Sequence, residues 1–110
     1  MQVAQVVFGR GDSLHVLDPL KSVNPGLILA FGSIGLLEVL AGHLTECFPG
    51  AVRVGCSTAG EISAKGVTDD TCVVTAVRFD NVQVVEAVTR LDGMADSLAA
   101  GERLSRQLPL

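Results

Sequence analysis

The sequence predicts an α/β domain in which packed helices cover a mixed, partly parallel sheet. Aliphatic runs at 27–31 and 52–56 flank a helical stretch of about a dozen residues, an order that predicts a parallel βαβ unit with a right-handed crossover. Further runs at 72–79 and 82–88 are joined by a tight turn, which predicts an antiparallel pair. With 110 residues, 48% of them hydrophobic, the chain has enough apolar surface for one small core.

Helical periodicity and turn residues place the remaining elements. A first strand is expected at 3–8, and Asp18-Pro19 is typical of the start of a short helix. The crossover helix is expected to end at Pro49-Gly50. Its apolar stripe consists of Leu36, Leu40, Leu44 and Phe48. A final amphipathic helix is expected from about Asp92. The face that packs consists of Met94, Leu98, Gly101, Leu104 or Ser105, and Leu108.

Small and polar residues follow both parallel strands, where an α/β sheet usually binds small molecules. Ser33 follows the first strand. The second runs into a turn made of Gly55, Cys56, Ser57, Thr58, Gly60 and Glu61. Glycines in such a turn let a ligand approach the backbone, so these residues are candidate ligand-binding positions. A purely structural alternative is a capping box, with Thr58 as the N-cap of a helical turn and Glu61 at its third position.

Several motifs, in a fixed order, are similar to those of one known family. The central motif is Gly55-Cys56-Ser57-Thr58-Ala59-Gly60-Glu61-Ile62. Flanking motifs are the strand and turn at 27–33, the Phe48-Pro49-Gly50-Ala51 segment, and the segments at 66–70 and 73–79. Together they resemble the N-terminal FIST domain, a sensory module of bacterial signal-transduction proteins. The resemblance implies that the chain senses a ligand and is not an enzyme.

The resemblance also implies ligands, a cofactor and partners. Amino-acid-like ligands are expected, and Glu61 would accept a hydrogen bond from the ligand's amino group. One branch of the family resembles haem-containing nitric-oxide sensors that regulate a histidine kinase or a cyclic-dinucleotide enzyme. In such a sensor His43 or His15 would be the axial haem ligand. The alternative for either residue is a half-buried histidine that makes one hydrogen bond.

A different class of function would depend on Cys56. Near a helix N-terminus its thiol would be activated, so an enzyme or a thiol redox sensor is an alternative. A cysteine hydrolase also needs a positioned histidine, and the sequence places neither of the two histidines beside Cys56. Ser57 is rejected as a hydrolase nucleophile, because its turn is one residue too long for G-x-S-x-G and both histidines precede it.

Charge and cysteine content exclude several partners. The net charge is −4 and no basic run is present, so neither nucleic acid nor an anionic membrane surface is an expected partner. An odd number of cysteines without close pairs argues against a disulfide framework or a zinc site. Cys47 and Cys72 are interpreted as small buried residues, and Asp69-Asp70 as a solvated turn. No secretion signal is recognised, so a cytoplasmic location is expected.

The last helix leads to an expectation about assembly. The resemblance implies a chain that continues well beyond this helix, so residues 1–110 are expected to be the N-terminal part of a FIST-like sensor domain. The helix agrees with this expectation, because its apolar face has no later element on which to pack. Exposed contiguous apolar surface drives association, and we therefore expect homo-oligomers.

Overall fold

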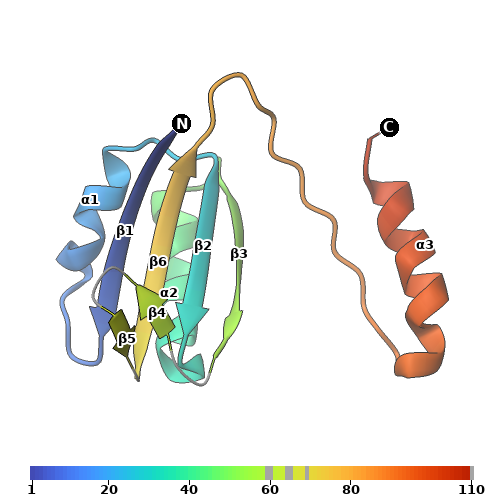
Figure 1. Ribbon diagram of the computed structural model, residues 1–110, viewed down its shortest axis with the longest axis horizontal. Helices are drawn as coiled ribbons and strands as arrows, with labels where there is room; N and C mark the ends of the chain where they lie inside the picture. Colours follow the sequence, from blue (N-terminus) through green and yellow to red (C-terminus); the bar gives the residue numbers. More distant parts are fainter. Residues whose placement is uncertain (59–60, 64–65, 69, 110) are drawn as a thin grey trace.

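A four-stranded mixed sheet forms the body of the molecule (Figure 1). The computed structural model describes residues 1–58, 61–63, 66–68 and 70–109, and for 61–63, 67 and 68 it describes the backbone alone. The sheet strands, in spatial order, are β1 (Gln2–Gly9), β6 (Thr71–Arg78), β2 (Leu27–Gly32) and β3 (Val52–Ser57). The helices are η1 (Leu14–Leu17), α1 (Asp18–Lys21), α2 (Ile34–Cys47), η2 (Met94–Asp96) and α3 (Ser97–Gln107).

The strand directions confirm the predicted fold class. β2 and β3 are parallel, with Leu27 opposite Val52 and Gly32 opposite Ser57. Helix α2 connects them, which is the predicted βαβ unit. β6 is antiparallel to both of its neighbours, β1 and β2. The sheet is therefore mixed and partly parallel.

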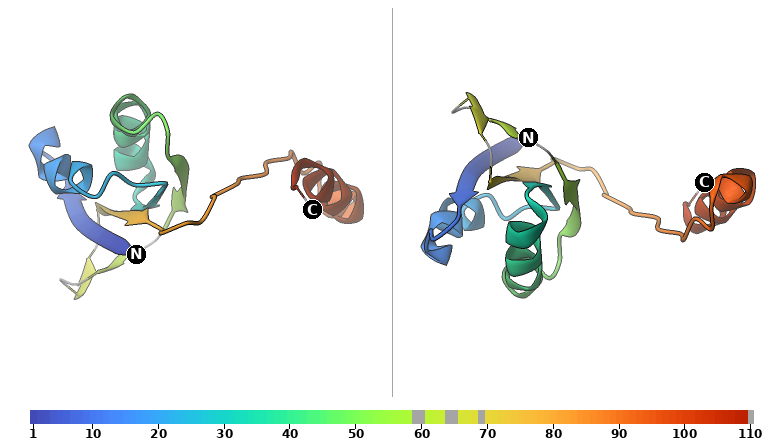
Figure 2. Two further views of the ribbon diagram at one scale, coloured as in Figure 1. Left: turned by 90° about the horizontal axis from the view of Figure 1, so that it is seen from above. Right: turned by 90° about the horizontal axis from the view of Figure 1, so that it is seen from below.

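The core lies between the sheet and the helices on one of its faces. Figure 2 shows α1 and α2 on the same face, with the β4–β5 hairpin on the other. Alternate residues of the strands point toward these helices and form buried rows. The rows are Phe8 on β1, Ile28 and Ala30 on β2, and Cys72, Val74 and Ala76 on β6. They pack against the predicted stripe of α2, of which Leu36, Leu40, Leu44 and Phe48 are buried.

The turn that ends α2 is held by an arginine from the next strand. The Arg53 Nη1 atom donates to the carbonyls of Phe48 (2.7 Å) and Ala51 (2.9 Å). A cation at this position also interacts favourably with the C-terminal end of the helix dipole.

None of the helices in the described part of the chain is long and apolar enough to cross a bilayer.

The expected strand at 82–88 is wrong. These residues are extended but pair with no strand in the part of the chain that the structure describes. The antiparallel partners of β6 come instead from β1 and β2, which precede it by many residues. Residues 82–92 lead away from the sheet to η2 and α3, which lie apart from it (Figure 1). The final helix thus forms as predicted, with Met94 and Leu98 exposed.

The segment between β3 and β6, where the polar sequence at 63–71 predicts a loop, contains two short strands. β4 (Glu61–Ser63) and β5 (Gly66–Thr68) pair antiparallel, with Glu61 opposite Thr68. Glu61 therefore lies in a strand and not at the third position of a helix. The capping-box alternative for Thr58 and Glu61 is wrong for this reason.

Two glycines permit close contact between strands. A Cβ atom added to Gly32 would lie 2.6 Å from the Cα atom of Cys72 and would overlap the Thr71 carbonyl oxygen. One added to Gly55 would overlap the Ala30 carbonyl. Real Cβ atoms are not found so close to backbone, so both positions require glycine for packing.

We predict that Gly32→Ala lowers the free energy of unfolding by about 1–3 kcal/mol, because β6 must move away from β2. The matched control is Gly42→Ala, in the exposed middle of α2, where an added Cβ meets nothing within 4 Å. The control is expected to raise stability by about 0.5–1 kcal/mol through helix propensity. Urea unfolding measures both changes, and equal effects of the two substitutions would contradict this account of Gly32.

Candidate functional site

The structure brings Ser33, Ser57 and Thr58 to one end of the sheet. Because β2 and β3 are parallel and in register, both strands end at the same edge (Figure 1). The Thr58 amide donates to the Gly32 carbonyl (2.9 Å), so Thr58 lies beside the residue that precedes Ser33. The Ser33 amide donates to the Thr71 carbonyl (3.1 Å), which adds the start of β6 to this edge. Ser33, Ser57 and Thr58 thus lie together at the sheet edge at which the sequence predicts ligand binding, although they line neither of the cavities described below.

Helix α2 begins at this edge with its first turn uncapped. Ser33 is its N-cap residue, yet the Ser33 side chain makes no capping hydrogen bond. The first N–H groups of a helix have no partner within the helix, and they attract negative charge. The Ser33 hydroxyl oxygen is shielded from solvent and has no hydrogen-bond partner of good geometry. A buried hydroxyl and an uncapped helix therefore lie together at the carboxyl end of β2.

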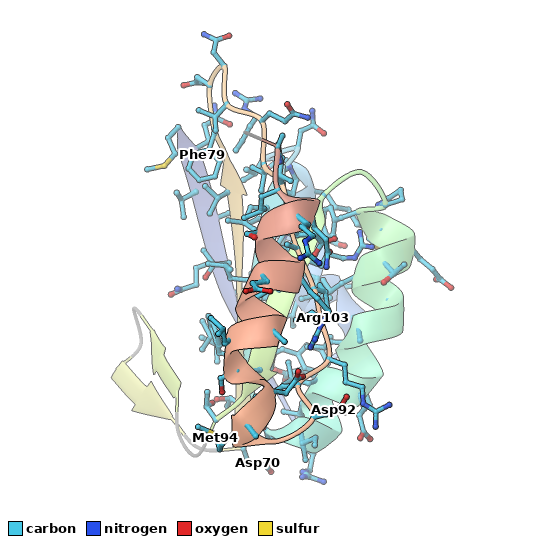
Figure 3. All side chains as sticks on the ribbon, turned by 90° about the vertical axis from the view of Figure 1, so that its right-hand side faces the viewer. Asp70, Phe79, Asp92, Met94 and Arg103 are labelled. Carbon is cyan, nitrogen blue, oxygen red and sulfur yellow. The ribbon has the colours of Figure 1, made fainter. Side chains whose placement is uncertain are left out.

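An ion pair that sequence reasoning missed lies next to Ser33. Arg10 binds Asp70 through two hydrogen bonds, from Nε to Oδ2 (2.8 Å) and from Nη2 to Oδ1 (2.9 Å). This bond from Arg10, with a smaller contribution from the Ser33 hydroxyl, lowers the pKa of Asp70. Figure 3 marks Asp70 and Phe79 at opposite ends of β6, with Asp70 at the end where β2 and β3 finish. The two partners are 60 residues apart, so no local motif could have paired them.

The structure separates other predicted site residues. Gly55, Cys56 and Ser57 belong to strand β3 and not to a turn. Gly55 and Ser57 are in register with Ala30 and Gly32, which places them on the sheet face toward α2. Cys56 alternates to the opposite face. Gly60 and the side chain of Glu61 lie outside the described residues.

Two of the cavities in the described part of the molecule lie next to the sheet. The smaller, about 350 Å³, lies between α2 and β3 and includes Leu40, Leu44 and Gly55 in its wall. The larger, about 550 Å³, lies at the other end of the sheet, where Gly26, Phe48 and Val82 contribute to its wall. Of the predicted site residues, Gly55 lines the smaller cavity. Gly55 therefore borders a cavity in addition to its packing role.

The histidines do not fit an axial haem ligand. The His15 side chain is 89% exposed, and its Nδ1 atom lies 3.3 Å from Asp18. The His43 Nε2 atom, which would bind iron, lies 3.4 Å from the Cys47 sulfur. Neither histidine lines either of the two cavities described above. A haem needs a histidine that faces an apolar pocket, so the described residues do not provide a haem site.

The three cysteines lie in three different environments. Cys72 is fully buried, as predicted, whereas Cys47 is only partly buried and contacts His43. Cys56 is exposed on the sheet face away from α2. Since His43 contacts Cys47 and His15 contacts Asp18, neither histidine is positioned as a base for Cys56.

Comparison with known proteins identifies the class. The chain matches the FIST N domain family over residues 26–110, which is most of its length. It therefore belongs to the FIST family and carries a sensory domain of signal transduction, which confirms the resemblance found in the sequence. No curated protein and no solved structure matches the chain. The matched range includes Ser33, Ser57 and Thr58, whereas Arg10 precedes it.

We predict that Asp70→Asn reduces the loss of stability in acid. The pKa of Asp70 is lowered below 3.8 in the folded protein, so the ion pair stabilises the fold above that pH. The stabilisation disappears as the pH falls through the lowered pKa. Thermal unfolding between about pH 5 and pH 2 is expected to show a shallower decrease in Tm for Asp70→Asn. Glu38→Gln is the control, because exposed Glu38 forms no ion pair in the described structure; an equal effect would contradict the assignment.

We predict that iodoacetamide modifies native Cys56 at least about tenfold faster than Cys72, since reactivity follows exposure of the thiol. Peptide mass spectrometry at several times would measure the two rates. In denaturant the rates should converge. Fast modification of Cys72 in the folded protein would show that the contact between β2 and β6 opens readily.

Proposed function

We propose that this domain senses a small ligand bound at the carboxyl ends of β2 and β3. The observation that carries the proposal is the Ser33 hydroxyl, which is buried and poorly bonded at the uncapped start of α2. A buried polar group without a good partner costs about 1–3 kcal/mol, and a bound ligand would recover this cost. Ser57 and Thr58 lie beside it and add hydroxyl groups.

The chemistry of this edge favours a ligand with a carboxylate and an amino group. A carboxylate at the start of α2 would accept hydrogen bonds from the first N–H groups and from Ser33. The amino group would then bind an acidic side chain. Asp70, which lies near Ser33, would accept through lone pairs that its two bonds from Arg10 leave over, and Glu61 in β4 is the second candidate. This is the pattern expected for the amino-acid-like ligands that the family resemblance implies.

The alternatives receive less support from the described residues. A haem-based nitric-oxide sensor lacks a histidine that faces a cavity. An enzyme that uses Cys56 lacks a nearby histidine base. Thiol redox sensing needs only an exposed sulfur, which Cys56 has, so it is the second candidate function. For either function, a kinase or a cyclic-dinucleotide enzyme is the output that we propose from the family.

The test is a thermal-shift screen with a panel of free L-amino acids. A ligand at about 100 times its Kd stabilises the folded protein by about 2.7 kcal/mol, which is easily seen as a rise in Tm. Ser33→Ala is predicted to remove this rise. The same substitution should leave the ligand-free protein as stable or up to about 1 kcal/mol more stable, because the hydroxyl makes no capping bond.

Ser22→Ala is the matched control. The Ser22 hydroxyl donates to the Pro19 carbonyl (2.8 Å) in α1, away from the candidate site. This variant should keep the full ligand-induced rise. If Ser33→Ala binds the same ligand with unchanged affinity, the ligand does not use this hydroxyl, and the proposed position of the site is wrong.

A further inference from the structure

The segment that leaves the sheet consists of an extended stretch and a helix. We call residues 85–107 the arm. Just before the arm, Val84 lies near Gly26 and lines the larger cavity. Beyond this point the extended chain and α3 lie away from the sheet (Figures 1 and 2). The arm nonetheless exposes large apolar side chains. These are Val85 (43%), Val88 (72%), Leu91 (53%) and Leu98 (78%).

Helix α3 covers one edge of the extended backbone and leaves the other open. Gln107 binds both the amide (3.2 Å) and the carbonyl (2.7 Å) of Val88, and Arg103 donates to the Arg90 carbonyl (2.7 Å). Figure 3 shows Arg103 and Asp92 on the side of α3 along which the extended segment runs. Successive backbone groups of an extended chain alternate in direction. The odd-numbered residues, including Val85 and Ala87, therefore turn their N–H and C=O groups away from α3, and these groups make no hydrogen bond in the described structure.

Strand β3 is an edge of the sheet, and it also has backbone groups that point outward. Val52 and Thr58 donate their amides toward β2, so the backbone groups of Arg53, Gly55 and Ser57 point outward from β3. Open edges are usually protected by charged side chains or proline. Arg53 is the one charge in β3, and its side chain is bent back to the Phe48 and Ala51 carbonyls. The opposite edge strand, β1, is contacted by α1 and η1.

We propose that the arm of one copy adds to the β3 edge of a second copy, and that the exchange is reciprocal. Each chain carries one extended segment with outward backbone groups and one open edge at β3, so a two-fold dimer pairs both arms with both β3 edges. Exposed Val54 on β3 would meet apolar side chains of the arm. The exchange does not depend on the proposed ligand.

The test compares two neighbouring proline substitutions in the full chain by light scattering coupled to size exclusion. Ala87→Pro removes an outward N–H and should raise the dimer dissociation constant at least about tenfold, because proline cannot donate to a strand ladder. Glu86→Pro removes an N–H on the side that faces α3 and should leave the dimer intact. The unsubstituted chain is expected to run at twice its mass of 11.4 kDa.

Other outcomes would overturn the proposal in distinguishable ways. A monomer at all concentrations, with a Tm lowered by Ala87→Pro alone, would show that the arm docks on its own sheet. A dimer that survives Ala87→Pro would place the interface elsewhere. Equal loss of the dimer in both variants would show that the outward edge of the arm is not the surface that pairs.

Discussion

The backbone of Gly32 lies in close contact with β6, and its carbonyl accepts the amide of Thr58 after β3. This contact requires the absence of a side chain, because a Cβ atom would overlap the Thr71 carbonyl. The end of β2, the end of β3 and the start of β6 therefore lie side by side at this edge of the sheet. Ser33, Thr58 and Asp70 meet at one edge because Gly32 holds these strands in register. The candidate site is therefore a consequence of strand packing and not of a single loop.

The same edge shows where the fold leaves polar groups unsatisfied. Helix α2 packs its leucine stripe on the sheet, and this packing sets the position of its first turn. The Ser33 side chain could have capped the helix, but its hydroxyl is buried near Asp70 instead. A cost of this kind persists in a folded protein when the group has a function or when packing compensates for it. In a sensory domain, a function in ligand binding would explain why the Ser33 hydroxyl is left without a good partner.

Local patterns predicted most of the helices and sheet strands, and the main error in topology concerns long-range pairing. The leucine period predicted α2 and the face that it buries, and the order of strand, helix and strand predicted the parallel pair. The turn at Asp80-Asn81 indicated a hairpin with the residues that follow it. Instead β6 pairs with β1, and the paired residues are about seventy positions apart in the sequence. The Arg10–Asp70 pair has the same origin, since it depends on β1 and β6 being neighbours. Thr58 and Glu61 matched a helix cap in spacing, but the chain continues into β4, which no local signal at these residues indicated.

The central claim is that ligand binds at the carboxyl ends of β2 and β3, and chemical-shift mapping of the backbone amides tests it most directly. Titration with the amino acid that raises the Tm most should shift the amides of Ser33 to Leu36, Ser57 and Thr58, with smaller changes in the middle of the sheet. Shifts confined to the larger cavity, at Gly26, Phe48 and Val82, would contradict the account. They would move the sensing site to the opposite end of the sheet.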